Sequence, residues 1–138
     1  MTDRELCAAA LQARQNAYAP YSGYRVGAAL LTADGRVFSG CNIENAAFSP
    51  TICAERTAVA KAVSEGAREI ERIAVAGGRG DTIGGGAPPC GVCRQVLAEF
   101  CGPQTEVLIV TGTDLSAERY RLSELLPRAF TPRQVWEG

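Results

Sequence analysis

Three cysteines and one glutamate constrain the fold of this chain more than any other feature. Cys53 precedes Glu55 by two positions, and Cys90 precedes Cys93 by three, directly after a proline. Residues two apart point roughly 200° away from each other inside a helix, so Cys53 and Glu55 can converge only in a first turn. The i, i+3 spacing likewise puts Cys90 and Cys93 on one side of a helix start. We therefore expect two helix N-termini to face one point, at the carboxyl ends of two parallel strands lying side by side.

The available donor atoms indicate a zinc site. The chain has no histidine, so thiolates are the natural ligands, and Zn²⁺ accepts them in a tetrahedron. Unpaired N–H groups and the positive dipole of a helix N-terminus favour thiolate over thiol. Without imidazole, proton transfer falls to a carboxylate, a tyrosine, a thiol or water, and Glu55 is the candidate.

Two interpretations of the cysteines stay open at this point. A catalytic site would use three sulfurs and the Glu55 carboxyl, with Arg56 and Arg94 as candidate hydrogen-bond donors to the sulfurs. A closed structural site would take Cys41 or Cys101 as a fourth sulfur, as in a non-catalytic zinc module that mediates protein or RNA contacts. A glutamate on an otherwise apolar helix favours the catalytic interpretation.

The bulk composition narrows the class of protein. A length of 138 residues suits one domain, predicted to cover 1–138. No apolar run reaches the ~20 residues of a membrane span, and the first residues lack an export signal. We therefore expect a cytoplasmic protein with no membrane contact and reduced cysteines. With a net charge of −1 and no basic stripe, a small neutral or weakly charged ligand is expected and a nucleic acid is not.

Periodicity and turn residues predict the element order α-β-β-α-β-α-β. The expected helices cover 3–19, 52–65 and 91–101, and the strands of this order cover 25–31, 36–41, 70–76 and 106–111, with a turn at Asp34-Gly35 and a glycine-rich loop over 77–89. A short edge strand at 119–122 and a last helical turn at 123–126 are expected to follow. This order predicts an α/β fold of three layers (α/β/α), in which helices cover both faces of a mixed sheet of about five strands.

Several segments carry a family resemblance. They are Ala19–Ser22, Val26–Leu30, Gly40–Ala46, Cys53–Thr57 and Pro89–Gln95, followed by Leu125–Pro127 and Phe130. With these segments the chain resembles the short, three-cysteine cytidine deaminases along nearly its whole length. The resemblance implies the three-layer fold of that family and hydrolytic deamination of cytidine and 2′-deoxycytidine in pyrimidine salvage.

The resemblance also implies roles for the motif residues. Cys53, Cys90 and Cys93 would hold one zinc ion per subunit, with water as the fourth ligand. Glu55 would take a proton from water, deliver it to N3 of the pyrimidine and later protonate the departing amino group. Asn42 would help to bind the sugar of a nucleoside.

Further substrate contacts follow from the same resemblance. Glu44 would bind the ribose hydroxyls together with Asn42, and its carboxylate would repel a 5′-phosphate. The backbone around Ala54 would meet the base carbonyl. The other predicted pocket residues are Tyr24, Asn45, Ala46 and Phe48. Tyr24 stands where relatives often have phenylalanine, and Phe48 stands where they often have tyrosine. The phenolic hydroxyl that relatives often carry at position 48 is therefore found at position 24 in this chain.

The family resemblance further implies a homo-oligomer, a tetramer, in which neighbouring chains complete each site. Phe130 would be such an inter-subunit contribution. A related substrate stays open as an alternative, namely another aminopyrimidine nucleoside such as blasticidin S, although the segment Asn42–Asn45 favours cytidine.

Overall fold

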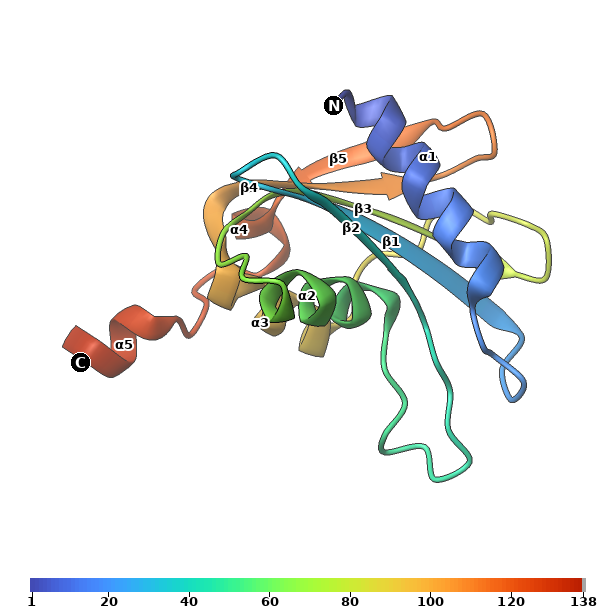
Figure 1. The fold of residues 1–138 in the computed structure, drawn as a ribbon, viewed down its shortest axis with the longest axis horizontal. Helices are drawn as coiled ribbons and strands as arrows, with labels where there is room; N and C mark the ends of the chain where they lie inside the picture. Colours follow the sequence, from blue (N-terminus) through green and yellow to red (C-terminus); the bar gives the residue numbers. More distant parts are fainter. Residues whose placement is uncertain (138) are drawn as a thin grey trace.

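One mixed sheet organises the chain in the computed structural model, which describes residues 1–137 (Figure 1). Its five strands run in the order β2-β1-β3-β4-β5. β3 and β4 pair in parallel, and every other neighbouring pair is antiparallel. The strand bounds are Tyr24–Thr32 (β1), Val37–Cys41 (β2), Ile70–Arg79 (β3), Cys101–Val110 (β4) and Ala117–Arg121 (β5).

Helices cover both faces of this sheet, which confirms the predicted three-layer α/β/α architecture (Figure 1). α1 packs on one face, and α2, α3 and α4 pack on the other. The helix bounds are Asp3–Ala13 (α1), Ala54–Ser64 (α2), Gly91–Phe100 (α3), Leu122–Leu125 (α4) and Pro132–Glu137 (α5), with a 3₁₀ turn at Arg14–Asn16. Within the described residues, no helix is both long and apolar enough to cross a bilayer.

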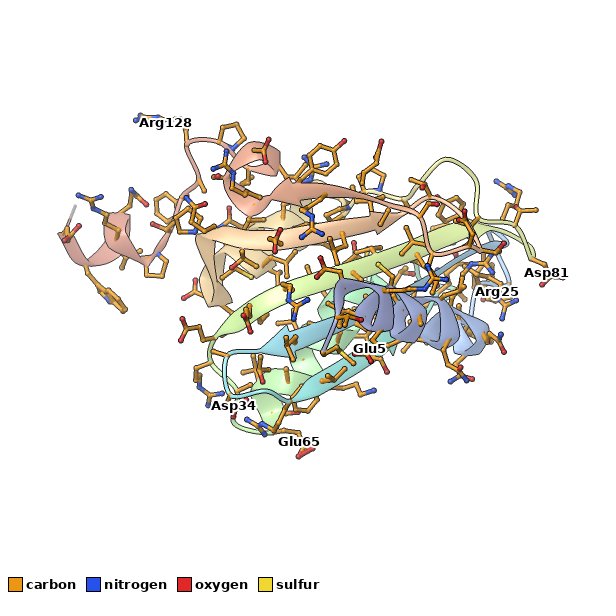
Figure 2. The ribbon with its side chains drawn as sticks, turned by 90° about the horizontal axis from the view of Figure 1, so that it is seen from above. Glu5, Arg25, Asp34, Glu65, Asp81 and Arg128 are labelled. Carbon is orange, nitrogen blue, oxygen red and sulfur yellow. The ribbon has the colours of Figure 1, made fainter. Side chains whose placement is uncertain are left out.

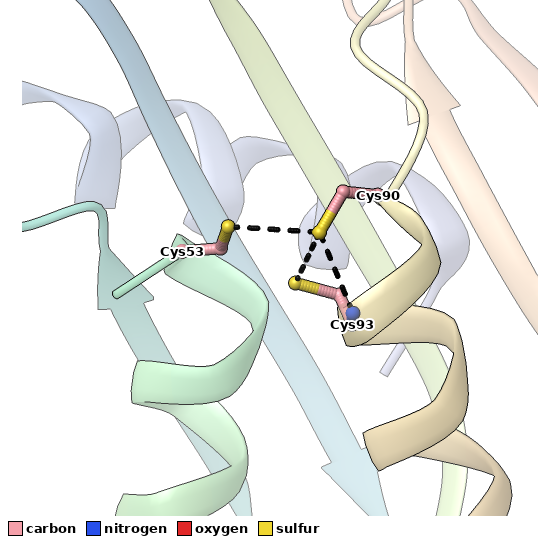
Figure 3. A group of neighbouring side chains, drawn as sticks. All are labelled: Cys53, Cys90 and Cys93. Atoms are coloured by element: carbon pink, nitrogen blue, oxygen red, sulfur yellow. Dashed lines mark hydrogen bonds between the residues drawn. The ribbon is translucent and has the colours of Figure 1, made fainter. Parts of the chain in front are cut away.

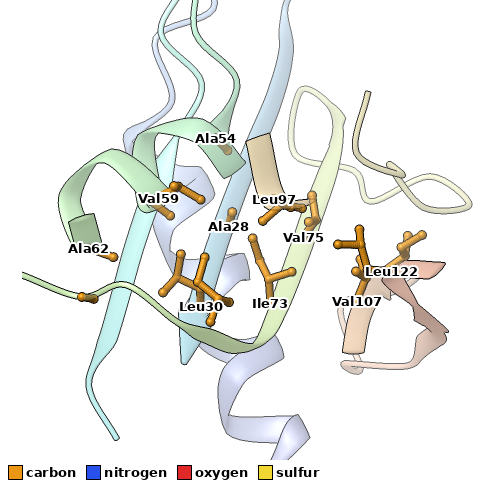
Figure 4. Close-up of a cluster of buried hydrophobic side chains, with 14 residues drawn as sticks. Ala28, Leu30, Ala54, Val59, Ala62, Ile73, Val75, Leu97, Val107 and Leu122 are labelled. Atoms are coloured by element: carbon orange, nitrogen blue, oxygen red, sulfur yellow. The ribbon is translucent and has the colours of Figure 1, made fainter. Parts of the chain in front are cut away.

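Strand periodicity divides the core into two clusters. Successive residues of a strand point to opposite faces, so Leu30 and Ile73 pack under α2 and α3 (Figure 4). Ala29 and Ala74, one residue away from each of them, pack instead against α1. Gly27 and Gly40 let α1 and α2, respectively, lie close to the sheet. A Cβ on Gly27 would lie 2.1 Å from the carbonyl oxygen of Ala10 in α1.

The predicted hairpin is present, with Asp34 in the turn between β1 and β2 (Figure 2). Gly35 adopts φ +88° there, the left-handed conformation that favours glycine. β5 and α4 lie within two residues of the predicted bounds. The C-terminal helix α5 was not expected, and it projects away from the sheet (Figure 1).

Three predicted boundaries are wrong. The first helix ends at Ala13 and not at residue 19, because its end lies against Gly27 and the chain then turns toward a bridge between Tyr18 and Ile43. β3 continues to Arg79, so the first residues of the predicted loop over 77–89 pair with β1. Cys101 belongs to β4 and not to a helix, since it pairs with Ile70 of β3.

The predicted adjacency of two parallel strands is also wrong. β2 leads into α2 and β3 leads into α3, and both run in the same direction because each is antiparallel to β1. β1 lies between them. β2 and β3 still have their carboxyl ends on the same side of the sheet. The N-termini of α2 and α3 therefore meet there, above the beginning of β1. Tyr24 and Val26 of β1 therefore lie beneath the meeting point.

Candidate active site

Two helix N-termini bring three sulfurs together (Figure 3). Cys53 is the N-cap of α2, Cys90 is the N-cap of α3, and Cys93 follows in the first turn of α3. The sulfur of Cys90 lies 3.8 Å from that of Cys53 and 3.4 Å from that of Cys93. Zinc–sulfur bonds of about 2.3 Å in a tetrahedron place sulfurs about 3.8 Å apart. The three sulfurs therefore fit a zinc ion.

The cluster offers three protein ligands. Among residues 1–137, no fourth ligand side chain joins the group of Cys53, Cys90 and Cys93. Cys101 lies at the start of β4, where burial raises the pKa of its thiol to about 12. Cys41 ends β2 outside the group. The four-sulfur alternative therefore finds no support, and a zinc ion held by these three sulfurs would have a further position available to water or substrate.

Hydrogen bonds to sulfur stabilise negative charge at Cys53. A hydrogen bond from Cys93 lowers the pKa of Cys53 to about 5, with help from Arg56 and Cys90 and against the effect of burial. The same contact, together with burial, raises the pKa of Cys93. Arg56 donates from Nη2 to the Cys53 sulfur across 3.8 Å. Arg94 does not act on the sulfurs, because it donates to the carbonyl oxygens of residues 89 and 125.

Glu55 is a buried carboxyl group beside the sulfurs. It lies in the first turn of α2 and is only 4% exposed. Burial raises the pKa of Glu55 to about 7; the Cys53 charge adds to this effect, while a backbone hydrogen bond and Arg56 oppose it. A carboxyl group with a pKa near neutrality can both accept and release a proton at physiological pH.

A pocket of about 350 Å³ opens beside Cys53, Glu55 and Cys90. Four of the predicted substrate-binding residues line it, namely Tyr24, Asn42, Glu44 and Ala54. Six lining residues were not predicted, namely Ser22, Val26, Thr51, Ile52, Ala87 and Pro88. Ser22 and Val26 belong to segments that carry the family resemblance, so the resemblance could have identified these two as pocket residues. A hollow of about 410 Å³ beside α4 is larger but lies away from the sulfurs.

Asn42 and Glu44 brace one wall of this pocket. The Asn42 side chain accepts from the Val26 amide at 2.8 Å and donates to the Tyr24 carbonyl at 2.8 Å. The Glu44 carboxylate accepts from the amide of Ser22 at 3.1 Å and also from its hydroxyl. These bonds lower the pKa of Glu44, with the Ser22 hydroxyl as the main cause. Both side chains are thus charged or polar groups held at the pocket rim.

The remaining predicted residues lie outside the pocket of this single chain. Asn45 and Ala46 are exposed in the segment between β2 and α2. Phe48 lines an adjoining hollow and meets the Tyr21 ring edge-on, with ring centroids 6.0 Å apart. Phe130 is 62% exposed, near α5. The roles of these residues in binding or at a subunit contact stay predictions.

The sequence matches one protein family. The profile described as "Cytidine and deoxycytidylate deaminase zinc-binding region" covers residues 1–110, which include all three sulfur ligands and Glu55. The chain belongs to this family of cytidine and deoxycytidylate deaminases. The cofactor is zinc, as both the family and the sulfur cluster indicate.

Individual relatives agree over nearly the full length. The chain is 49% identical to a cytidine deaminase of Halalkalibacterium halodurans over 91% of its length and 92% of the relative's. It is 48% identical to a cytidine deaminase of Sporosarcina psychrophila, over 98% of this chain and 96% of the relative. Its fold is similar to the crystal structure of cytidine deaminase from Burkholderia pseudomallei, with a TM-score of 0.85 and 45% identity, covering 94% of this chain and 100% of that one. The structural similarity confirms the α/β fold expected from the sequence.

Proposed function

We propose that this protein is a cytidine deaminase that converts cytidine and 2′-deoxycytidine, with water, to uridine and 2′-deoxyuridine plus ammonia. One observation carries the proposal: a buried carboxyl group, Glu55, stands beside three sulfurs that fit zinc, at the end of a pocket of about 350 Å³. The names of the relatives support the same reaction. Residues 1–138 would form a single catalytic domain.

The chain supplies the ligands and the proton carrier. Cys53, Cys90 and Cys93 would hold the zinc ion, which when bound provides a Lewis acid that makes water a better nucleophile. Glu55 would accept a proton from the attacking water and pass it to N3 of the base. Glu55 would then take the remaining proton from the hydroxyl group added at C4 and give it to the amino group, so that the C4–N bond breaks, ammonia departs and the C4 oxygen remains as a carbonyl.

The pocket rim suits a neutral nucleoside. Asn42 and Glu44 would hydrogen-bond the ribose hydroxyls, and the negative charge of Glu44 would disfavour a 5′-phosphate. Tyr24 would lie against the substrate and the Ala54 backbone would meet the base carbonyl. Asn45, Ala46 and Phe48 would complete the wall next to the sugar.

We further propose that the active enzyme is a cytoplasmic homotetramer. Exposed aromatic side chains support an oligomer, since Phe48, Phe130 and Trp136 are 70%, 62% and 83% exposed in the isolated chain. Phe130 would reach the site of a neighbouring subunit. None of the six cysteines, all within the described residues, forms a disulfide bond, which suits a reducing compartment.

A spectrophotometric assay of cytidine to uridine tests the proposal. The zinc-loaded protein should turn over cytidine and deoxycytidine, and a chelator should abolish turnover until zinc is restored. Blasticidin S serves as the comparison substrate. Turnover of blasticidin S alone, or of none of these compounds by zinc-loaded protein, would contradict the proposal.

A further inference from the structure

We propose that Arg14 is a positioning residue that holds two walls of the pocket together, an inference that rests on the proposed function. Arg14 is 5% exposed. It donates from Nε to the carbonyl oxygen of Arg25 at 3.0 Å. Its Nη2 lies within hydrogen-bond distance of three further carbonyl oxygens, those of Gly78 (2.8 Å), Gly80 and Thr82 (2.9 Å).

This arginine is an unusual buried cation. In the described part of the chain, no carboxylate lies within ion-pair distance of Arg14. Leaving a buried guanidinium without hydrogen-bond partners is strongly unfavourable, so backbone carbonyls must stay gathered around it. One carbonyl belongs to β1 and three belong to the segment 78–82. Arg14 therefore ties the beginning of β1 to the chain that leaves β3.

The first wall of the pocket begins at β1. Tyr24 and Val26, which flank Arg25, both line the pocket. Strand pairing joins Tyr24 to Arg79 and Arg25 to Gly78, and the Gly80 amide donates to the Gly23 carbonyl at 3.2 Å, so Arg14 adds to these contacts and extends them to Thr82. Arg25 also forms an exposed ion pair with Asp81 across 3.9 Å, and both lie at the same end of the molecule (Figure 2).

The second wall is the segment that returns from β3 toward α3. A Cβ on Gly78 would lie 1.9 Å from the Thr82 carbonyl oxygen, because the chain folds back tightly around Arg14. A Cβ on Gly77 would lie 2.7 Å from the Cβ of Ala87. Ala87 thus packs directly on the strand, where it lines the pocket together with Pro88. Two glycines and one buried arginine together set the course of this wall.

Arg14 does not line the pocket itself, so its loss should loosen contacts that substrate and transition state share. Removing such contacts raises KM and leaves kcat nearly unchanged. For Arg14→Gln we expect KM for cytidine to rise about tenfold or more, with kcat within about twofold and one zinc ion per chain. Arg14→Lys keeps the charge and some donors, so its KM should be intermediate.

The matched control is Arg68→Gln. Arg68 also donates to two backbone carbonyls, those of Val63 and Ala67, each at 2.8 Å, but it lies outside the pocket. The KM of Arg68→Gln for cytidine should equal that of the wild type. If Arg14→Gln does not fold, Gly78→Ala takes its place, because the added Cβ displaces the Thr82 carbonyl while Arg14 remains. Gly78→Ala should raise KM for cytidine in the same way as Arg14→Gln.

A second measurement does not depend on turnover. Trypsin can cleave after the exposed Arg79, inside the segment that Arg14 holds. Cleavage at this bond, followed by mass spectrometry, should be several-fold faster in Arg14→Gln and Gly78→Ala than in the wild type and in Arg68→Gln. Unchanged KM in a folded Arg14→Gln, or a loss confined to kcat, would overturn the inference. If the wild type did not turn over cytidine, the proposed function would fail, and equal cleavage rates would separately overturn the tie.

Discussion

The first turns of α1 and α2, on opposite faces of the sheet, make different use of the same structural element. In α1 the Thr2 hydroxyl accepts from the Glu5 amide at 3.1 Å, and the Glu5 carboxylate accepts from the Thr2 amide at 2.8 Å. In α2 the N-cap Cys53 makes no such side-chain bond. The first helix start caps its own N–H groups, while the second has no side-chain cap and lies beside the sulfurs and the pocket.

The acidic residues of the two turns show the same contrast. Burial alone would raise the pKa of Asp3 in α1, but hydrogen bonds from Arg72 and Arg119 outweigh it and lower the pKa. Burial raises the pKa of Glu55 in α2 to about 7. Both carboxyl groups lie at a positive helix end, which favours ionisation. Burial without an ion-pair partner reverses that preference for Glu55, and this difference separates a stabilising carboxylate from a proton carrier.

The largest expected effect is loss of the metal. Cys53→Ala removes one of three sulfurs, so zinc content per chain, measured by mass spectrometry, should fall far below one and turnover should disappear. Cys101→Ala is the control and should keep its zinc, because Cys101 lies outside the cluster. Full zinc in Cys53→Ala, or loss of zinc in Cys101→Ala, would contradict the assigned ligand set.

Glu55→Gln should be next in size. The amide cannot carry the proton, so kcat should fall by about 10²–10⁴-fold, the usual contribution of general acid–base catalysis, while zinc content stays at one. Glu5→Gln makes the same change in the first turn of α1 and should leave kcat unaltered. Comparable losses in both variants would mean that the two helix starts do not differ in the way described.

Arg56→Gln should have a smaller effect. Loss of the hydrogen bond to Cys53 should weaken zinc binding by about 10–100-fold, as is common for groups that contact metal ligands. Competition with a chromophoric chelator measures this affinity. Arg72→Gln removes the arginine that serves Asp3 in α1, and its zinc affinity should match the wild type.

Asp3→Asn should have the smallest effect. The lowered pKa of Asp3 means that its ionised form stabilises the fold above the pKa of the unfolded chain, about 4. Denaturant unfolding at pH 7 should show a loss of about 0.5–1 kcal/mol, since the ion pairs are partly exposed to solvent. This difference between wild type and variant should shrink as the pH falls below about 4. A difference that grows on acidification would have the wrong sign.

Local patterns were sufficient for the sulfur cluster and for most of the sheet. The spacing of Cys90 and Cys93, and of Cys53 and Glu55, dictates a helix start by geometry alone, and period-two strands reveal their buried faces. Arg56 and Arg94 show where such reasoning ends. Each follows a cysteine motif closely, yet only Arg56 donates to sulfur, because the direction of a long side chain depends on which carbonyls lie nearby.

Long-range pairing explains the other differences. The position of β1 between β2 and β3 depends on how the sheet assembles, and the local sequence of these strands does not indicate it. It brings Val26 under the site, while Ala87 arrives from the glycine-rich segment. Arg14 lies inside the predicted helix over 3–19, which assigns it no particular role, although its guanidinium is enclosed by carbonyls.

The separation of the sulfurs along the chain has a consequence for folding. Cys53 and Cys90 are 37 positions apart, and the intervening chain contains α2 and β3. An ion bound by both closes that stretch into a ring and restricts the denatured ensemble, much as a covalent crosslink does. The melting temperature should therefore depend on free zinc concentration, and a cell starved of the metal would hold a protein that is easier to unfold and degrade as well as inactive.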